Sequence, residues 1–149
     1  MDMDIEKLLT PNRITFELKG RTKEEAIEEL IEILYKDRVI EDKQEFKSAV
    51  MKREKEFSTG IGYGVGIPHG KSKAVKEAAI ALGISKSGIE FDSMDGEPVN
   101  LLFLIAVPDK SDDIHLKILS YISRRLMHEE VRDRLKEAKT YNQILEAFK

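Results

Sequence analysis

The amino-acid sequence predicts an α/β fold, a three-layer sandwich in which helices lie on both faces of a mixed β-sheet. Helical patterns fill residues 22–53 and return after residue 111, whereas strand patterns dominate the residues between them. The apolar run at 99–107, VNLLFLIAV, is stopped by Pro108, as expected of a central strand buried on both faces. Helices before and after a strand-rich middle favour this sandwich over an all-α or all-β fold.

The chain begins with a predicted strand and two predicted helices. Apolar and polar residues alternate over residues 13–18, which is the period of a strand with one buried face. Thr22 and Glu25 then form a capping box, and apolar residues follow at helical spacing. Asp42 starts a second helix in the same way, and the apolar stripe of this helix continues as far as Arg53.

The middle of the chain supplies the sheet. Residues 79–85 place alternate aliphatic side chains on one face with small residues between them, and 88–91 is a further short strand pattern. The pair Asp95-Gly96 is a turn signal before the strand at 99–107. The resulting hairpin is antiparallel, so the sheet is expected to be mixed.

The last third of the chain is helical. Ser111 is the predicted N-cap of a helix, and Asp112 and Asp113 suit the positive end of its dipole. Two shorter helices are predicted at 129–138 and 141–148.

The composition favours a single domain over residues 1–149. Hydrophobic residues make up 41% and charged residues 36%, which suits a folded domain, and the formal charge of −3 gives no reason to expect a nucleic acid partner. The chain has no cysteine, no signal-peptide pattern and no apolar run near the ~20 residues that span a bilayer. We therefore expect a cytoplasmic protein without direct membrane insertion.

A glycine-rich segment, GIGYGVGIPHGKS at residues 60–72, raises the question of nucleotide binding. A P-loop would need a glycine five residues before Gly70, where the sequence has Val65. The pattern G-x-G-x-x-G of dinucleotide-binding folds is missing as well. The segment therefore matches neither nucleotide-binding motif. The sequence indicates instead a flexible glycine-rich stretch.

The same segment directs attention to His69, which lies between Pro68 and Gly70. Glycines allow backbone amides to approach an anion, and the proline restrains the direction of the imidazole ring. Imidazole is a good nucleophile near neutral pH and can carry a phosphoryl group covalently. The alternative is an exposed turn histidine, which is the commoner role of an isolated Pro-His-Gly.

Two further residues suit phosphoryl chemistry. Arg53 follows Val50 in the apolar stripe, so its guanidinium needs an anion; the alternatives are snorkelling at the helix end or pairing with Glu54 or Glu56. His115 lies in the first turn of its predicted helix, where the dipole favours a neutral ring that can donate a hydrogen bond. The alternative for His115 is local packing only.

A zinc site made of His69, His115 and a carboxylate is a remaining alternative. No H-x-x-x-H or H-E-x-x-H spacing supports it, and His128 is interpreted as a surface residue. We expect neither a metal nor a cofactor.

Three motifs together resemble the enzyme IIA component of the bacterial phosphoenolpyruvate-dependent sugar phosphotransferase system, of the fructose and mannitol type. The first is STGIGYGVGIPHGKS at 58–72, the second is Pro108 followed by His115-Leu116 at a helix start, and the third is the Arg53-Glu54 pair. The resemblance covers nearly the whole chain and implies a mixed sheet with helices on both sides.

The resemblance also implies roles for the three candidate residues. His69 would receive a phosphoryl group from phosphohistidine on the carrier protein HPr and pass it to a cysteine of enzyme IIB, which serves the membrane component IIC. His115 would donate a hydrogen bond to the phosphoryl group, and Arg53 would stabilise its charge. Such transfer requires chiefly positioning and charge stabilisation.

Two questions stay open at the level of sequence. The nitrogen-type phosphotransferase branch resembles the same motifs and regulates target proteins by its phosphorylation state, so it is the alternative to sugar transport. Among sugars, the form IPHGKS resembles the fructose group more than the mannitol group. A docking patch for partner proteins is predicted on the apolar side chains of the glycine segment, with loop packing as the alternative for at least half of them: Ile61, Tyr63, Val65 and Ile67.

Overall fold

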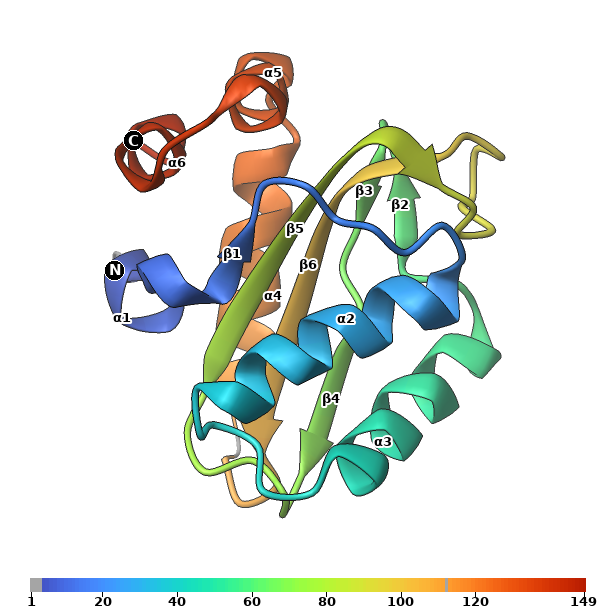
Figure 1. Ribbon diagram of the computed structural model, residues 1–149, viewed down its shortest axis with the longest axis vertical. Helices are drawn as coiled ribbons and strands as arrows, with labels where there is room; N and C mark the ends of the chain where they lie inside the picture. Colours follow the sequence, from blue (N-terminus) through green and yellow to red (C-terminus); the bar gives the residue numbers. More distant parts are fainter. Residues whose placement is uncertain (1–3, 112) are drawn as a thin grey trace.

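The computed structural model describes residues 4–111 and 113–149 and is drawn in Figure 1. The helices are α1 (Ile5–Leu8), the 3-10 helix η1 (Pro11–Arg13), α2 (Lys23–Lys36), α3 (Lys43–Glu56), α4 (Ile114–Leu126), α5 (Glu129–Glu137) and α6 (Tyr141–Ala147). The strands are β1 (Ile14–Thr15), β2 (Gly60–Gly62), β3 (Val65–Gly66), β4 (His69–Ser72), β5 (Ala79–Ile89) and β6 (Val99–Pro108). Within these described ranges, no helix combines the length and apolar character needed to cross a bilayer.

The strands form one sheet in the order β1-β5-β6-β3-β2, and β4 also pairs with β6. β5 and β6 are antiparallel neighbours, with Leu82 opposite Phe103. β1 runs parallel to β5, while β3 and β4 both run parallel to β6. The sheet is therefore mixed, which confirms the prediction made from the turn at Asp95-Gly96.

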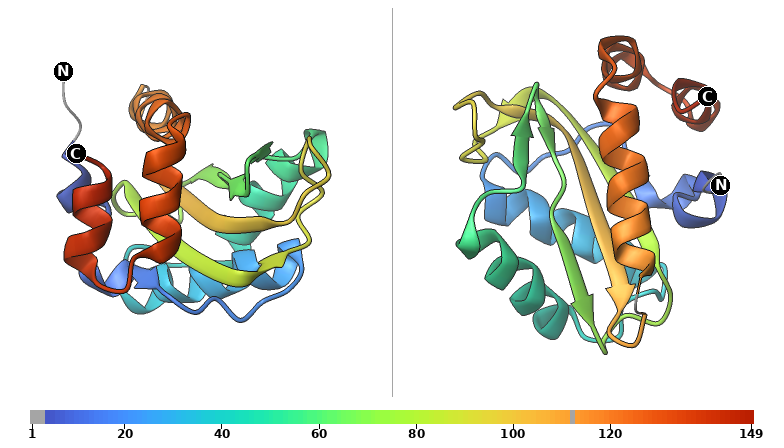
Figure 2. Two further views of the ribbon diagram at one scale, coloured as in Figure 1. Left: turned by 90° about the horizontal axis from the view of Figure 1, so that it is seen from above. Right: turned by 180° about the vertical axis from the view of Figure 1, so that it is seen from behind.

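Each of the two long strands contributes to a core on both faces of the sheet, because successive side chains point in opposite directions. Leu82 and Phe103 belong to the core that α1, α4, α5 and α6 cover. Ala81 and Leu104 belong to the core beneath α2 and α3. Figure 2 shows α2 and α3 on one side of the sheet and α4 on the other. The predicted three-layer sandwich is confirmed.

Two predicted helix starts are confirmed. Thr22 accepts a hydrogen bond from the backbone N–H of Glu25, whose carboxylate accepts from the backbone N–H of Thr22, so the capping box is complete. At α3, the Asp42 side chain accepts from the backbone N–H of Glu45 at 3.1 Å. Both caps satisfy N–H groups that have no partner inside the helix.

The predicted cap at Ser111 is wrong. Helix α4 starts at Ile114, and its N-cap is Asp113, whose side chain makes no capping hydrogen bond. Ser111 instead donates its backbone N–H to the carbonyl of Pro108 at 3.2 Å, in the turn that leaves β6. Asp112 lies outside the described residues.

The glycine-rich segment is not the flexible loop that the sequence indicated. It forms β2, β3 and β4, of which β3 and β4 pair with the central strand β6. Other strand predictions hold with changed lengths: the pattern at 13–18 yields only β1, and β5 extends into the strand predicted at 88–91. The segment therefore belongs to the sheet.

The first and last helices lie together on the β1 side of the sheet. The Tyr141 hydroxyl at the start of α6 donates to the carbonyl of Leu9 at 2.7 Å, and Ile5 and Phe148 share one core. Figure 1 shows α1 and α6 on this side, with α3 and β4 toward the opposite side.

Candidate active site

His69 is the first residue of β4, where it pairs with Ile105 of the central strand. The next residue explains why β4 lies so close to helix α3. A Cβ atom on Gly70 would lie 2.8 Å from Cγ2 of Val50 and 3.1 Å from Cε1 of Phe46. Only glycine allows this approach, which places His69 beside the helix that carries Arg53.

The hydrogen bonding of His69 fixes which ring nitrogen is free. Nδ1 lies 2.9 Å from the backbone carbonyl of Ile67, and because a carbonyl only accepts, Nδ1 must carry the hydrogen in this contact. In the neutral ring, Nε2 then keeps its lone pair. The side chain is half-buried. In its neutral form, His69 therefore has its free lone pair on Nε2.

The surroundings of His69 also favour the neutral ring. Burial lowers the pKa of His69 below its usual value, and the positive charges of Arg53 and His115 lower it further. The hydrogen bond with Ile67 and the carboxylate of Glu54 act in the opposite direction and raise this pKa. The net lowering means that the ring keeps its nucleophilic form at neutral pH.

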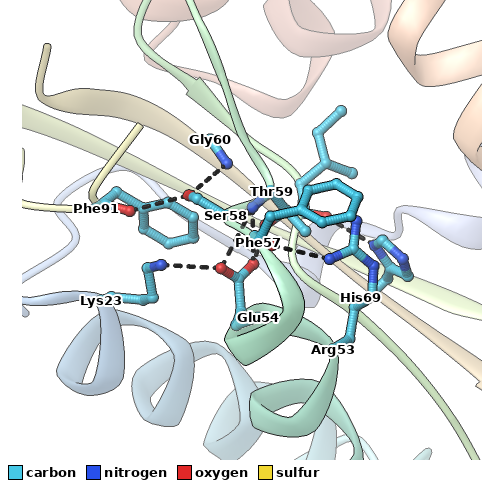
Figure 3. A network of polar contacts seen from close by, with 10 residues as sticks. Lys23, Arg53, Glu54, Phe57, Ser58, Thr59, Gly60, His69 and Phe91 are labelled. Atoms are coloured by element: carbon cyan, nitrogen blue, oxygen red, sulfur yellow. Dashed lines mark hydrogen bonds and ion pairs between the residues drawn. The ribbon is translucent and has the colours of Figure 1, made fainter. Parts of the chain in front are cut away.

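Arg53 lies near the end of α3, which reaches Arg53 as the sequence predicted and continues to Glu56. Its Nη1 donates to the carbonyl of Phe57 at 2.9 Å, and the guanidinium lies 4.4 Å from the centre of the Phe57 ring. Among the ion pairs of the described residues, none involves Arg53, so it pairs with neither Glu54 nor Glu56. Figure 3 shows Arg53 extending toward His69. Without a carboxylate partner among the described residues, its charge can serve an arriving anion.

His115 is the second residue of α4, in the first turn as predicted. The side chain is half-buried, and its Nδ1 atom is buried without a hydrogen-bond partner among the described residues. A positive charge on His115 would lower the pKa of His69. His128 is exposed at the start of α5, in agreement with its interpretation as a surface residue.

Sequence reasoning named Glu54 only as a motif residue and as an alternative partner of Arg53, and did not predict that it is buried. Its carboxylate pairs with Nζ of Lys23 at 2.9 Å and accepts from both the backbone N–H and the hydroxyl of Thr59. A signal was present in the sequence: Glu54 follows Phe46 and Val50 at intervals of four, on the buried stripe of α3. A charged residue on such a stripe calls for a buried partner.

The predicted docking patch divides into two halves. Val65 and Ile67 are buried in the core beneath α4, so the packing alternative holds for them. Ile61 and Tyr63 are exposed, at 42% and 70% of their surface. Near the three candidate residues, two other large apolar side chains are exposed, namely Phe57 at 66% and Leu116 at 58%. An accessible apolar surface thus accompanies the site.

The zinc alternative gains no support from the geometry. In the described part of the chain, no cluster of three or more histidine, cysteine or carboxylate residues is placed to hold a metal ion. Among the residues that the structure describes, His69 and His115 therefore lack a third ligand of this kind.

Phosphoryl transfer through a histidine requires chiefly a positioned nucleophile and nearby positive or hydrogen-donating groups. Phosphotransferases are the class of protein that the fold and this arrangement define together. Comparison with known families makes the assignment specific. The chain belongs to the family "Phosphoenolpyruvate-dependent sugar phosphotransferase system, EIIA 2", whose model matches residues 7–149.

Curated relatives fall into two groups by name. The chain is 43% identical to the "PTS system fructose-specific EIIA component" of Haloferax volcanii, over 94% of this chain and 92% of that protein. It is 40% identical to the "PTS system fructose-specific EIIABC component" of Bacillus subtilis over 97% of its length, but spans only 23% of that longer protein. A "Nitrogen regulatory protein" of Pseudomonas aeruginosa is 33% identical, over 91% of this chain and 88% of that one.

Solved structures share the fold. "Nitrogen Regulatory Protein IIA-Ntr" from Neisseria meningitidis superposes with a TM-score of 0.89 at 28% identity, covering 97% of this chain and 99% of that one. The complex of IIAMTL and phosphorylated IIBMTL from Escherichia coli gives a TM-score of 0.81 at 25% identity, covering 95% of this chain and 98% of that chain.

Proposed function

We propose that the chain is the phosphocarrier of a fructose-specific phosphotransferase system and that His69 carries the phosphoryl group on Nε2. The observation that carries this proposal is the contact between Nδ1 of His69 and the Ile67 carbonyl, which leaves Nε2 as the nucleophile. The donor is phosphohistidine on HPr, and the acceptor is a cysteine of enzyme IIB. The domain serves the membrane component IIC indirectly, works in the cytoplasm and binds no nucleic acid.

Two displacements at phosphorus complete the cycle. The Nε2 lone pair of His69 forms a bond to phosphorus while the bond to the HPr imidazole breaks, and that imidazole leaves with the electron pair. The cysteine thiolate of IIB then attacks the same phosphorus, and the bond to Nε2 breaks. His69 returns to its neutral form with Nδ1–H still hydrogen-bonded to the Ile67 carbonyl. The ring therefore neither gains nor loses a proton over the cycle.

Arg53 and His115 stabilise the charge that the phosphoryl group brings. Among the described residues, the Arg53 guanidinium has no carboxylate partner and contacts Phe57, so it can bind phosphoryl oxygens without losing an ion pair to any of them. We assign a hydrogen bond to the same group to His115, because a positive charge on His115 acts on the pKa of His69.

The partner proteins dock over the exposed apolar side chains at the site. Phe57 packs on Arg53, and Leu116 follows His115 in α4, so both flank the reacting group. HPr and IIB must each present a side chain to His69, which requires an open surface rather than a deep cavity. The structural similarity to the IIA protein in the mannitol IIA–IIB complex supports an approach of this kind.

The substrate class follows from the relatives. The fructose-specific relatives are 43% and 40% identical to the chain, against 33% for the nitrogen regulatory protein. The high TM-score with the IIA-Ntr structure keeps the nitrogen-type regulator as the second candidate. The two candidates differ in their acceptor: a fructose-specific phosphocarrier should pass its phosphoryl group to a fructose-specific IIB protein, whereas a nitrogen-type regulator should not.

The test is a reconstituted transfer assay. The chain is incubated with phosphoenolpyruvate, enzyme I and HPr, and its intact mass is measured under alkaline conditions that preserve phosphohistidine. One phosphate should be added, His69→Ala should abolish it, and the exposed His128→Ala control should retain it. Label that persists in the His69→Ala variant would refute the site. Adding a fructose-specific IIB should discharge the label, whereas retention of the label would favour the regulatory candidate.

A further inference from the structure

Glu54 is a buried charge that the phosphoryl-transfer step does not itself use. Its side chain is 2% exposed, and its Lys23 partner on α2 is 19% exposed. The Lys23 ammonium also lies 4.8 Å from the centre of the Phe91 ring, which shields one side of the ion pair. Burying an ion pair between two helices has a large desolvation cost, so we looked for a specific role for this pair.

The first link of that role joins Glu54 to Thr59. The carboxylate accepts from the Thr59 backbone N–H, with 3.3 Å to each oxygen, and from the Thr59 hydroxyl. These bonds fix the turn between the end of α3 and the start of β2 (Figure 3). The backbone of Thr59 is therefore held at a set distance from α3.

The second link leads from Thr59 to the reactive ring. The Thr59 carbonyl accepts from the backbone N–H of Ile67 at 3.0 Å. The Ile67 carbonyl in turn accepts from Nδ1 of His69 at 2.9 Å. Hydrogen bonds thus join the Lys23–Glu54 pair to His69 through two residues. The same carbonyl of Ile67 decides which tautomer His69 adopts.

The third link concerns the arginine. The turn that Glu54 closes contains Phe57, whose carbonyl accepts from Nη1 of Arg53 and whose ring lies against the guanidinium. A shift of this turn would move the acceptor that orients Arg53. One carboxylate therefore supports both the nucleophile and the stabilising cation.

We propose that Glu54, held by Lys23, is a positioning residue for phosphoryl transfer: through Thr59 and Ile67 it fixes the Nδ1–H tautomer and the orientation of His69. The proposal rests on the proposed function for its kinetic consequence. Its effect on the tautomer stands independently, because it concerns the unphosphorylated protein.

The experiment compares Glu54→Gln with Glu56→Gln, a matched control that removes the same charge from an exposed position two residues away on α3. Glutamine keeps the shape of the side chain but loses the charge that Lys23 requires. Nitrogen NMR shifts of the His69 ring report the tautomer directly. Wild type and Glu56→Gln should show a protonated Nδ1 and an unprotonated Nε2, whereas Glu54→Gln should show both tautomers.

Transfer kinetics provide the second readout. At saturating phospho-HPr, the Glu54→Gln rate constant should fall about tenfold to a hundredfold, as expected when a reacting group is misplaced. The half-saturation concentration of HPr should change by less than about twofold, because the docking surface is intact. A general loss of structure would alter both quantities and the thermal unfolding profile.

If Glu54→Gln does not fold, a second pair of variants at Lys23 tests the same proposal. Lys23→Met should mix the tautomers in the same way, and Lys23→Arg, which preserves the ion pair, should restore the wild-type spectrum. Wild-type tautomer and rate in either Glu54→Gln or Lys23→Met overturn the proposal. Failure of wild type and Glu56→Gln to accept phosphate would instead contradict the proposed function, while the NMR comparison still decides the role of Glu54.

Discussion

At the scale of single residues, the proposed phosphoryl transfer depends on which ring nitrogen of His69 is hydrogen-bonded to the backbone. The Ile67 carbonyl accepts a hydrogen bond from Nδ1, and burial lowers the pKa of the ring, which favours its neutral form. Nε2 can then attack phosphorus at neutral pH without prior loss of a proton. A base that removes a proton from the nucleophile is therefore unnecessary in this mechanism.

His69 should titrate below the ordinary histidine pKa of about 6.5. Burial is the main cause, and the Arg53 charge adds to it, so removing that charge in Arg53→Ala should raise the midpoint. Following the ring carbon and nitrogen shifts of His69 by NMR across pH measures both values. A wild-type midpoint at or above 6.5 would contradict the electrostatic description.

Arg53→Ala should slow phosphoryl acceptance by about a hundredfold, because a cation aimed at the developing charge is lost. Lys52→Ala is the matched control, since it removes a neighbouring exposed charge from the same helix. Rapid-quench measurement with phospho-HPr gives the rates. Equal rates for the two variants would remove Arg53 from the mechanism.

At the scale of elements, the site depends on the contact between α3 and β4. Helix α3 carries Arg53 and Glu54, and β4 carries His69. The absence of a side chain at Gly70 lets the strand approach the helix. The Pro-His-Gly triplet thus places His69, the proposed nucleophile, directly before the glycine that allows β4 to pack close to α3.

Gly70→Ala should lower stability and transfer rate together. The added methyl group would lie 2.8 Å from Cγ2 of Val50, and overpacking of this kind costs about 1–3 kcal/mol. Adding Val50→Ala removes the clashing atom, so the double variant should lose less than the two single losses combined. Denaturant unfolding measures this coupling, and strict additivity would show that the contact is not the cause.

Sequence reasoning predicted these elements unevenly. The helix starts at Thr22 and Asp42 were predictable because capping involves residues three positions apart. The strands of the glycine segment were not predictable, because β3 and β4 are defined by pairing with β6, more than thirty residues away. Ser111 failed as a cap because the turn after β6 binds its backbone before the helix begins.

The candidate site shows the same division. His69, Arg53 and His115 were identified from residue types and motifs, and in the structure Arg53 and His115 both act to lower the pKa of His69. Glu54 was not assigned a role, since its importance rests on an ion pair between α2 and α3 that only the folded protein brings together.

At the scale of the whole molecule, the apolar side chains around His69 form part of an open surface. Replacing Phe57 by Asp should raise the half-saturation concentration for HPr, because the charge would oppose apolar packing at an interface. Met127→Asp is the control, an equally drastic change at a side chain that is 75% exposed at the end of α4. Transfer rates at varied HPr concentration distinguish the two, and identical curves would argue against docking at Phe57.

The contact between α1 and α6 has a consequence for how the domain can be used. Tyr141 ties the last helix to Leu9 on the β1 side of the sheet, while His69 lies on β4, on the other side of β6. A linker that leaves from α1 or α6 would therefore depart on the side of the sheet away from His69, the proposed phosphorylation site. The same unit is suited to diffuse freely or to swing on a tether between its donor and its acceptor.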